Sequence, residues 1–248
     1  GPVVIGHEVT GVVDTIGSGL STDSLGRPIK EGDRVAYPYF FPCRSCYNCL
    51  RGQLNYCTQR FRFRASVEDY PYCSGGFAEY YYLPPGHFVF KVPDELPNEA
   101  VTPANCALSQ VIYGLQRAKV GLGDSVVIQG AGGLGINATA AAREMGAGQI
   151  IVIDGLDNRL EMARQCGADK TIDMREYTTP ESRIEYVKEL TESRGADVVM
   201  EVVGYPNVVL EGLEMVRMGG TFVEIGNIWP NSFANIDISK FIWGGLSI

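Results

Sequence analysis

The spacing of apolar positions changes along the chain, and the first hundred residues favour short strands. Residues 3–5 and 9–16 are rich in β-branched side chains, which strands prefer, and a short glycine-flanked polar segment separates them. A turn over residues 31–33 leads into another apolar run, and a glycine turn precedes the aromatic segment 77–82. We therefore predict a first part made of short strands and turns, including a strand over the aromatic segment.

Beyond residue 100, apolar segments alternate with helical stretches. This alternation predicts a parallel β-sheet that is covered by helices on both faces, with the boundary of the two parts near residues 105–118. The expected strands occupy residues 125–129, 149–153, 170–172, 197–202, 220–225 and 244–248, and the expected helices occupy residues 134–146, 157–166, 181–193 and 207–217.

A glycine-rich turn joins the first of these expected strands to a helix, with the spacing G-x-G-x-x-G. In a dinucleotide site Gly130 would allow the sharp turn, Gly132 would leave room for the pyrophosphate, and Gly135 would let the helix pack close to the sheet. The free N–H groups at the start of the helix, beside Gly133, favour phosphate. The pattern therefore predicts a dinucleotide site, and a turn that binds nothing is the alternative.

An acidic residue ends the second expected strand of the sheet. Asp154 lies 19 positions after Gly135, where its carboxylate can accept hydrogen bonds from a ribose hydroxyl and would repel a 2′-phosphate. This residue favours NAD over NADP. Arg159, one helical turn further on, is interpreted either as a contact to the adenosine side of the cofactor or as a solvated arginine.

Four of the seven cysteines are clustered in one segment, residues 42–60. Without a sign of secretion, such a cluster indicates a metal site before a set of disulfides. Four thiolates suit a closed, tetrahedral zinc site that braces a loop. An iron–sulfur cluster and reactive thiols are the alternatives. The cysteines follow the pattern C-x₂-C-x₂-C-x₇-C, at Cys43, Cys46, Cys49 and Cys57.

Composition narrows the possible functions. The 248 residues carry a formal net charge of −8, which argues against a nucleic-acid or anionic membrane surface. No apolar run approaches the roughly 20 residues that span a bilayer, and the N-terminal segment is unlike a signal peptide, so we predict a cytoplasmic protein. Because the chain begins without methionine and ends inside an expected strand, we interpret the sequence as lacking both termini.

Several motifs occur in the order found in one enzyme family. They are Gly6-His7-Glu8 with Gly11, the four clustered cysteines, Gly76-Phe77-Ala78-Glu79-Tyr80, Cys106, and the glycine turn with Asp154. With them the chain resembles, over essentially its whole length, the zinc-containing medium-chain alcohol dehydrogenases, in particular polyol and threonine dehydrogenases. The resemblance implies an α/β protein with a partial GroES-like, mostly-β catalytic domain over residues 1–106, which carries a zinc-binding lobe at residues 42–60. A doubly wound parallel-sheet Rossmann domain follows over residues 107–248.

The resemblance also implies roles for single residues. His7 and Cys106 match two protein ligands of a catalytic zinc, and Glu8 matches a carboxylate that approaches the metal when water or substrate exchanges. From the residues alone, His7 can also be a half-buried histidine whose ring nitrogens are hydrogen-bonded, and Cys106 can also be a buried thiol. The clustered cysteines match the family's structural zinc site. Positions that contact the cofactor in the family correspond to Leu134, Asp154 and Arg159.

The function implied by the resemblance is hydride transfer between NAD and a small-molecule alcohol or carbonyl, such as a secondary alcohol or a polyol. The complete protein would hold one structural and one catalytic Zn²⁺ and would form a homodimer or homotetramer. The family's upstream cysteine ligand and its C-terminal segment are not in the sequence, and Gln110 stands where many relatives carry threonine.

Other functions stay open. A zinc-free NAD(P)H reductase of the same superfamily and a non-catalytic NAD-binding protein with structural zinc are the alternatives, while the acidic charge opposes a nucleic-acid-binding zinc ribbon. Tyr70, Tyr72 and Phe77 are candidates for lining a substrate pocket, with packing in the core as the other interpretation. His87 is interpreted as a surface loop residue.

Overall fold

The computed structural model describes residues 2–59, 66–68, 72 and 74–248. The chain divides into two compact units, one ending at Ser109 and the other beginning at Gln110. Among the described residues no helix is long and apolar enough to cross a membrane.

The first unit is built around a small antiparallel sheet. Its strands β1 (Thr10–Val12), β2 (Arg34–Ala36) and β3 (Phe90–Lys91) pair in the order β1-β2-β3. Short apolar segments of the loops close its core, because strands this short bury few side chains of their own. The core consists of Ile29, Val35, Tyr37 and Val89, with Val9, Val13, Ile16, Tyr81 and Leu83 packed against it.

Short helices complete this unit. They are α1 (Tyr47–Leu50), the 3₁₀ helix η1 (Leu54–Tyr56), α2 (Asn98–Val101) and the 3₁₀ helix η2 (Thr102–Asn105). Helix α3 (Ala107–Arg117) begins in the first unit and continues in the second.

The second unit is an open parallel sheet with the strand order β6-β5-β4-β7-β8. The chain enters at the central strand, runs to one edge through β5 and β6, and then returns past the centre to β7 and β8. The order therefore reverses between β4 and β7, and in such sheets ligands bind outside the carboxyl ends of the strands at that point. The strands are β4 (Ser125–Gln129), β5 (Gln149–Asp154), β6 (Lys170–Asp173), β7 (Ala196–Glu201) and β8 (Val216–Glu224).

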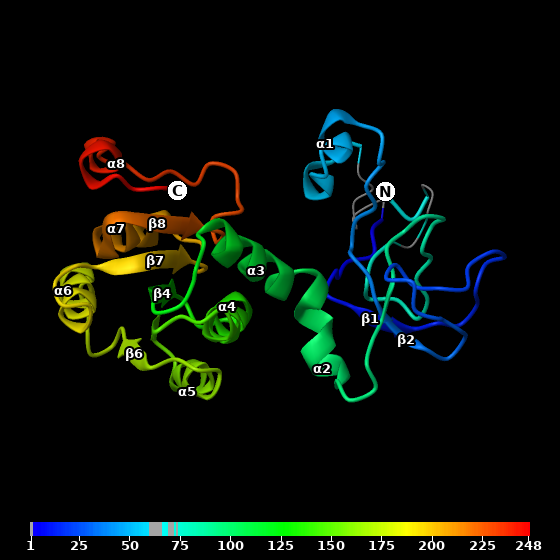
Figure 1. Cartoon of the computed structure of the whole chain (residues 1–248), viewed down its shortest axis with the longest axis horizontal. Helices are drawn as coiled ribbons and strands as arrows, with labels where there is room; N and C mark the ends of the chain where they lie inside the picture. The colour runs from blue at the N-terminus through cyan, green and yellow to red at the C-terminus, as the bar shows by residue number, and fades with distance from the viewer. Residues whose placement is uncertain (1, 60–65, 69–71, 73) are drawn as a thin grey trace. The chain divides into compact units, whose positions relative to one another are not determined.

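Helices cover both faces of this sheet (Figure 1). One face packs on α3, α4 and α5, and the other packs on α6 and α7, so alternate residues of the buried strands serve opposite cores. These findings confirm the predicted α/β organisation. The helices are α4 (Gly133–Glu144), α5 (Asp157–Gln165), α6 (Pro180–Leu190), α7 (Pro206–Met215) and α8 (Ser239–Gly244).

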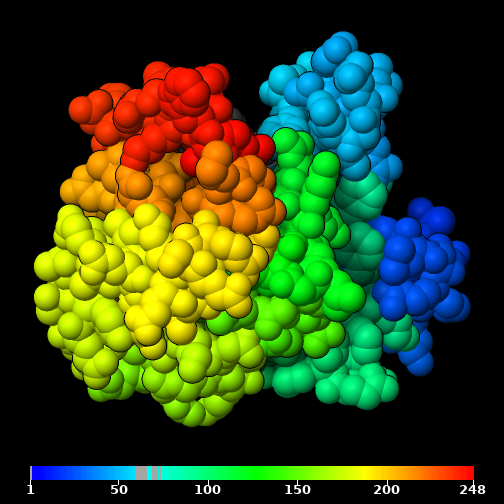
Figure 2. Space-filling view, turned by 60° about the vertical axis from the view of Figure 1, so that its left-hand side comes forward, coloured from blue at the N-terminus to red at the C-terminus, as the bar shows by residue number. Residues whose placement is uncertain are grey.

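Three predicted strands are wrong. Residues 3–5 contribute only an isolated bridge between Val3 and Ser66. Residues 239–244 form α8, Gly245 leaves this helix in a left-handed conformation, and only Ser247 pairs with β8 as an isolated bridge. Figure 2 shows this C-terminal segment, in red, lying over the orange segment that contains α7 and β8. Residues 77–82 form no strand either. At the start of this segment the backbone N–H of Phe77 donates to the carbonyl oxygen of Ile5 at 2.9 Å, so the segment begins against the N-terminal backbone.

A buried ion pair joins α6 to α7 and yields a stability prediction. Arg183 and Glu211 form a two-pronged pair at 2.7 Å, and both side chains are less than a tenth exposed. We expect Arg183→Met to lower the free energy of unfolding by about 3–5 kcal/mol, because the Glu211 carboxylate stays buried without its partner. Urea unfolding measures this loss.

The double substitution Arg183→Met/Glu211→Leu should recover most of that loss, since it removes both buried charges. Removing the exposed pair of Arg164 and Glu161 by Arg164→Met should change the same free energy by less than about 1 kcal/mol. An equal loss for the buried and the exposed pair would contradict the prediction.

Candidate functional site

A histidine and a cysteine far apart in the sequence meet in the first unit. The Nε2 atom of His7 lies 3.1 Å from the Sγ atom of Cys106. His7 follows Gly6, whose φ of +92° turns the chain away from the preceding segment, and Cys106 follows η2 directly. A tetrahedral zinc with one nitrogen and one sulfur ligand would hold these atoms about 3.5 Å apart. The two donors therefore fit one metal ion without rearrangement of the backbone.

Glu8 lies beside the same pair. Its Oε1 atom accepts a hydrogen bond from the backbone N–H of Ala107 at 3.1 Å, which keeps the carboxylate next to Cys106. Burial raises the pKa of the half-buried Cys106 thiol to about 11, and the negative charge of Glu8 adds to this rise. A metal ion bound here would remove that thiol proton, because the thiolate is the ligand form.

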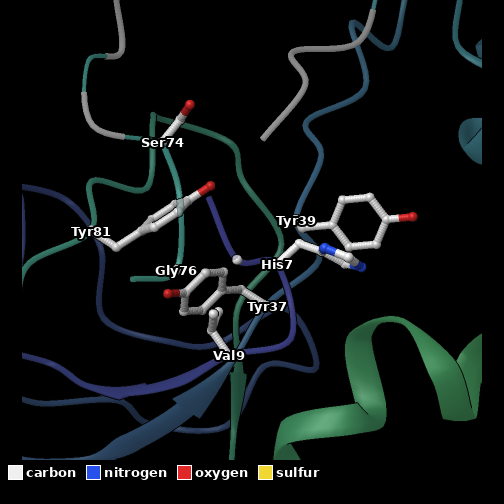
Figure 3. A pocket seen from close by; sticks show the side chains of 8 residues that line it. His7, Val9, Tyr37, Tyr39, Ser74, Gly76 and Tyr81 are labelled. Atoms are coloured by element: carbon white, nitrogen blue, oxygen red, sulfur yellow. The ribbon is translucent and has the colours of Figure 1, made fainter. Parts of the chain in front are cut away.

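An aromatic ring packs on His7. Tyr39 packs edge-to-face on the imidazole with 4.9 Å between ring centroids, and Figure 3 shows the two rings side by side. The sequence analysis did not predict Tyr39 as part of the site. The signal that could have pointed to it is the run of aromatic residues just before Cys43. The adjoining pocket is lined by Gly6, His7, Val9, Tyr37, Tyr39, Ser74, Gly76 and Tyr81.

Two of the residues that the sequence suggested for a substrate pocket do not line the pocket beside His7. Phe77 is 75% exposed and Tyr72 is 54% exposed, and neither lines this pocket. Tyr70 lies outside the described residues. His87 is not a surface residue: it is half-buried, its ring stacks on Phe41 at 5.6 Å, and burial lowers its pKa.

The structure gathers the four clustered thiols. The four Sγ atoms all lie within 4.8 Å of one another. The Sγ atoms of Cys43 and Cys49 are 4.0 Å apart, and so are those of Cys46 and Cys57. Four sulfurs around one tetrahedral zinc would be separated by about 3.8 Å. The short distances between the sulfur atoms and the all-sulfur donor set fit a structural zinc.

Backbone N–H groups donate hydrogen bonds to several of the clustered thiols. The N–H of Cys46 donates to the Sγ atom of Cys43, and the N–H of Cys43 donates to the Sγ atom of Cys57, both at 3.3 Å. The backbone N–H of Cys49 is the main cause that lowers the pKa of Cys46 to about 5. Burial instead raises the pKa of Cys49 to about 12. Backbone donors thus prepare part of the cluster for a cation.

The glycine turn of the second unit has the close contacts that its spacing predicted. Gly130 has a φ of +98°, and a Cβ there would lie 2.8 Å from the Cγ2 atom of Val203. A Cβ on Gly135 would lie 1.8 Å from the carbonyl oxygen of Gly130, whereas Gly132 and Gly133 face open space. The half-buried Leu134 packs on the α4 side of the core. The turn thus leaves backbone N–H groups at the start of α4 accessible to a phosphate.

Asp154 lies at the end of β5 and closes this turn. Its Oδ2 atom accepts a hydrogen bond from the N–H of Ala131 at 2.8 Å, and its Oδ1 atom accepts from the N–H groups of Gly155 and Leu156. The guanidinium of Arg159 lies 3.6 Å from Oδ2. The structure therefore brings the predicted acid and arginine together at the carboxyl edge of the sheet.

Two family models match the chain. The first, described as the alcohol dehydrogenase GroES-like domain, covers residues 1–94, and the second, described as zinc-binding dehydrogenase, covers residues 133–248. Both parts of the chain therefore match domains of one enzyme class.

Curated relatives and solved structures agree with these matches. The chain is 36% identical over 230 residues to 5-exo-hydroxycamphor dehydrogenase of Pseudomonas putida, covering 92% of this chain and 62% of the relative. It is 35% identical to sorbitol dehydrogenase of Bombyx mori, covering 91% of this chain and 61% of the relative. The chain thus spans about three fifths of the length of these relatives. An alcohol dehydrogenase structure from Thermotoga maritima matches with a TM-score of 0.92 and 30% identity, covering 99% of this chain and 68% of that one.

The close approach at Gly135 yields a second stability prediction. We expect Gly135→Ala to lower the free energy of unfolding by about 1–3 kcal/mol, because the added methyl would collide with a backbone carbonyl that cannot rotate away. Gly133→Ala, which meets no atom within 4 Å, is the matched control and should leave this energy nearly unchanged. Urea unfolding of both variants tests the prediction, and equal stabilities would contradict it.

Proposed function

Because the chain belongs to the zinc-containing medium-chain alcohol dehydrogenase family, we propose that the protein transfers a hydride between an alcohol and a nicotinamide dinucleotide. The observation that carries the proposal is the meeting of His7, Glu8 and Cys106, three residues whose side chains suit a catalytic zinc site. A glycine turn suited to a dinucleotide lies in the second unit of the same chain. These two features support a metal-assisted reaction that uses a nicotinamide cofactor.

His7 and Cys106 would hold the catalytic metal. A zinc ion bound here supplies Lewis acidity, which lowers the pKa of an alcohol hydroxyl. Glu8 is fixed by the N–H of Ala107, so its carboxylate is placed to take part in ligand exchange beside Cys106. Tyr39 shields one edge of the imidazole and restricts the rotation of His7. The four clustered cysteines would hold a second, structural zinc.

The cofactor we propose is NAD. Asp154 places a carboxylate at the end of β5, where a 2′-phosphate would meet its negative charge. Each carboxylate oxygen has two acceptor positions, so Asp154 can accept from a ribose hydroxyl in addition to its backbone donors. Arg159 balances part of this charge and stays within reach of the adenosine side. Gly130, Gly132, Gly133, Leu134 and Gly135 would form the pyrophosphate turn.

The proposed substrates are secondary alcohols or polyols and the matching carbonyl compounds. Relatives named for hydroxycamphor and sorbitol support this class. A cytoplasmic location and a homodimer or homotetramer remain predictions from the sequence. The zinc-free reductase and the non-catalytic NAD-binding protein are the outcomes against which the proposal is tested.

Zinc content distinguishes these functions. We expect two zinc ions per chain by elemental mass spectrometry after dialysis of the complete protein. Cys46→Ser should remove one and His7→Ala the other, because each substitution deletes a ligand of a different site. One zinc that is lost in Cys46→Ser but kept in His7→Ala would leave a structural site only. Unchanged alcohol oxidation in His7→Ala would also overturn the proposal.

Cofactor choice tests the role of Asp154. We expect Asp154→Asn to weaken NAD⁺ binding about tenfold or more, since a hydrogen bond to a charged group contributes about 1.5–3 kcal/mol. The same change should improve NADP⁺ binding relative to NAD⁺ because the repulsion of the 2′-phosphate falls. Isothermal titration calorimetry measures both affinities. Glu161→Gln removes an exposed charge on α5 and should change neither; an unchanged NAD⁺ to NADP⁺ ratio in Asp154→Asn would contradict the assignment.

A further inference from the structure

Three polar residues form a row across the carboxyl ends of neighbouring strands. Gln129 on β4 pairs in register with Glu201 on β7, which in turn pairs in register with Glu224 on β8. Two residues earlier the same strands place Val127, Val199 and Phe222 in an apolar core. Gln129 and Glu201 are buried and extend that core with polar groups, whereas Glu224 is exposed at the end of β8, at the edge of the sheet where ligands bind.

Glu201 is the central member of the row and is fully buried. Its Oε1 atom accepts hydrogen bonds from the N–H groups of Val203 at 2.6 Å and Gly204 at 2.8 Å. These two bonds fix the turn that follows β7. A buried carboxyl group with such a role orders the backbone around it.

Asn227 connects the two carboxyl groups. Its Nδ2 atom lies 3.2 Å from the Oε2 atom of Glu201 and 3.1 Å from the Oε1 atom of Glu224, which also accepts the backbone N–H of Asn227 at 2.8 Å. A Cβ on Gly226 would lie 2.4 Å from Oε2 of Glu201, and a Cβ on Gly204 would lie 2.7 Å from the carbonyl oxygen of Gly226. The turns after β7 and β8 therefore pack directly on each other through this group.

The charges of this group are unbalanced. In the part of the chain that the structure describes, a charged group that faces Glu201 is the exposed Glu224 from β8, while β4 contributes the neutral Gln129 and the turn after β8 contributes the neutral Asn227. Burial raises the pKa of Glu201 to about 7, and the charge of Glu224 adds to this rise. Among the described residues, Gln129 Oε1 and Asn227 Oδ1 are buried acceptors without a hydrogen-bond partner. A proton held by the pair gives the row an additional donor.

The turn after β7 also touches the glycine turn. The space that a Cβ on Gly130 would fill is occupied by Val203, with its Cγ2 atom at 2.8 Å and its backbone nitrogen at 3.6 Å. A dinucleotide bound to a sheet of this order would cross the point where the strand order reverses, between β4 and β7. The carboxyl pair is thus linked through Val203 to the place where the proposed cofactor would cross the sheet.

We propose that Glu201 and Glu224 share a proton and, with Asn227, hold the turns after β7 and β8 in the conformation that receives the nicotinamide half of the cofactor. Glu224 is then a positioning residue for the cofactor. This inference rests on the proposed NAD binding. When the shared proton is lost to solvent, two carboxylates face one amide group and repel each other, so the turns separate and the cofactor binds less tightly.

The direction of the pH effect follows from the raised pKa. Because folded Glu201 keeps its proton to a higher pH than an unfolded glutamate, the folded chain binds more protons between about pH 4.5 and pH 7. Stability contributed by this residue is therefore largest at low pH, falls across that window and stays low above it. Cofactor affinity should fall as the pH rises through about 7 and above it, because there the folded protein loses the shared proton.

The test compares Glu224→Gln with the unaltered protein. Glutamine keeps the size and a hydrogen-bonding group of Glu224 but removes the charge. By calorimetry we expect the Kd of the unaltered protein for NAD⁺ to rise by up to about tenfold between about pH 6 and about pH 8, as one linked proton allows. In Glu224→Gln the Kd should change less than about twofold. Glu185→Gln, which removes an exposed charge on α6, should keep the profile of the unaltered protein.

A second measurement needs no cofactor. Carbon-13 NMR of labelled glutamate carboxyl groups should show one group that titrates near neutral pH, which disappears in Glu201→Gln and titrates at lower pH in Glu224→Gln. If NAD⁺ binds with the same pH profile in Glu224→Gln and the unaltered protein, the inference is wrong while the proposed function stands. If NAD⁺ binds at no pH, the proposed function fails, and the positioning role fails with it.

Discussion

The close approach of two backbone segments at the glycine turn is the constraint on which the second unit depends. The carbonyl oxygen of Gly130 occupies the space that a side chain on Gly135 would need, so β4 and the start of α4 are in direct contact. This contact sets where the free N–H groups of α4 lie, and it brings Ala131 within hydrogen-bonding distance of Asp154. The turn, the helix start and the acid of β5 are therefore one arrangement, because no flexible side chain lies between them.

Buried carboxyl groups at the same edge of the sheet hold the turns that follow their strands. Asp154 accepts three backbone N–H groups and Glu201 accepts two, so each buried carboxyl group shapes the turn that follows its strand. The two differ in what balances their charge. Asp154 has a guanidinium nearby, whereas Glu201 faces another carboxyl group. This difference makes one edge position suited to a fixed negative charge and the other suited to a shared proton.

The two groups of sulfur and nitrogen donors in the first unit also differ in their surroundings. The four clustered thiols are close to one another and receive backbone N–H donors, which suits a closed site. His7 and Cys106 form a pair beside a carboxylate and an aromatic ring, and the described residues add no third nitrogen or sulfur ligand. A carboxylate next to two candidate zinc ligands suits a site where ligands exchange, which is what metal-assisted alcohol chemistry requires.

The sequence by itself determined the elements whose signals are local. Alternating apolar segments placed β4 to β7 and α4 to α7 within a few residues, and the spacing of glycines and cysteines identified the turn and the thiol cluster, because such motifs depend on neighbouring positions. Only the tertiary structure decided which distant residues meet. The contact of His7 with Tyr39, the row of Gln129, Glu201 and Glu224, and the absence of a strand at residues 244–248 depend on strand register and backbone packing. A single apolar or acidic residue carries no information about its partner across a sheet, so these contacts are settled only when the chain has folded.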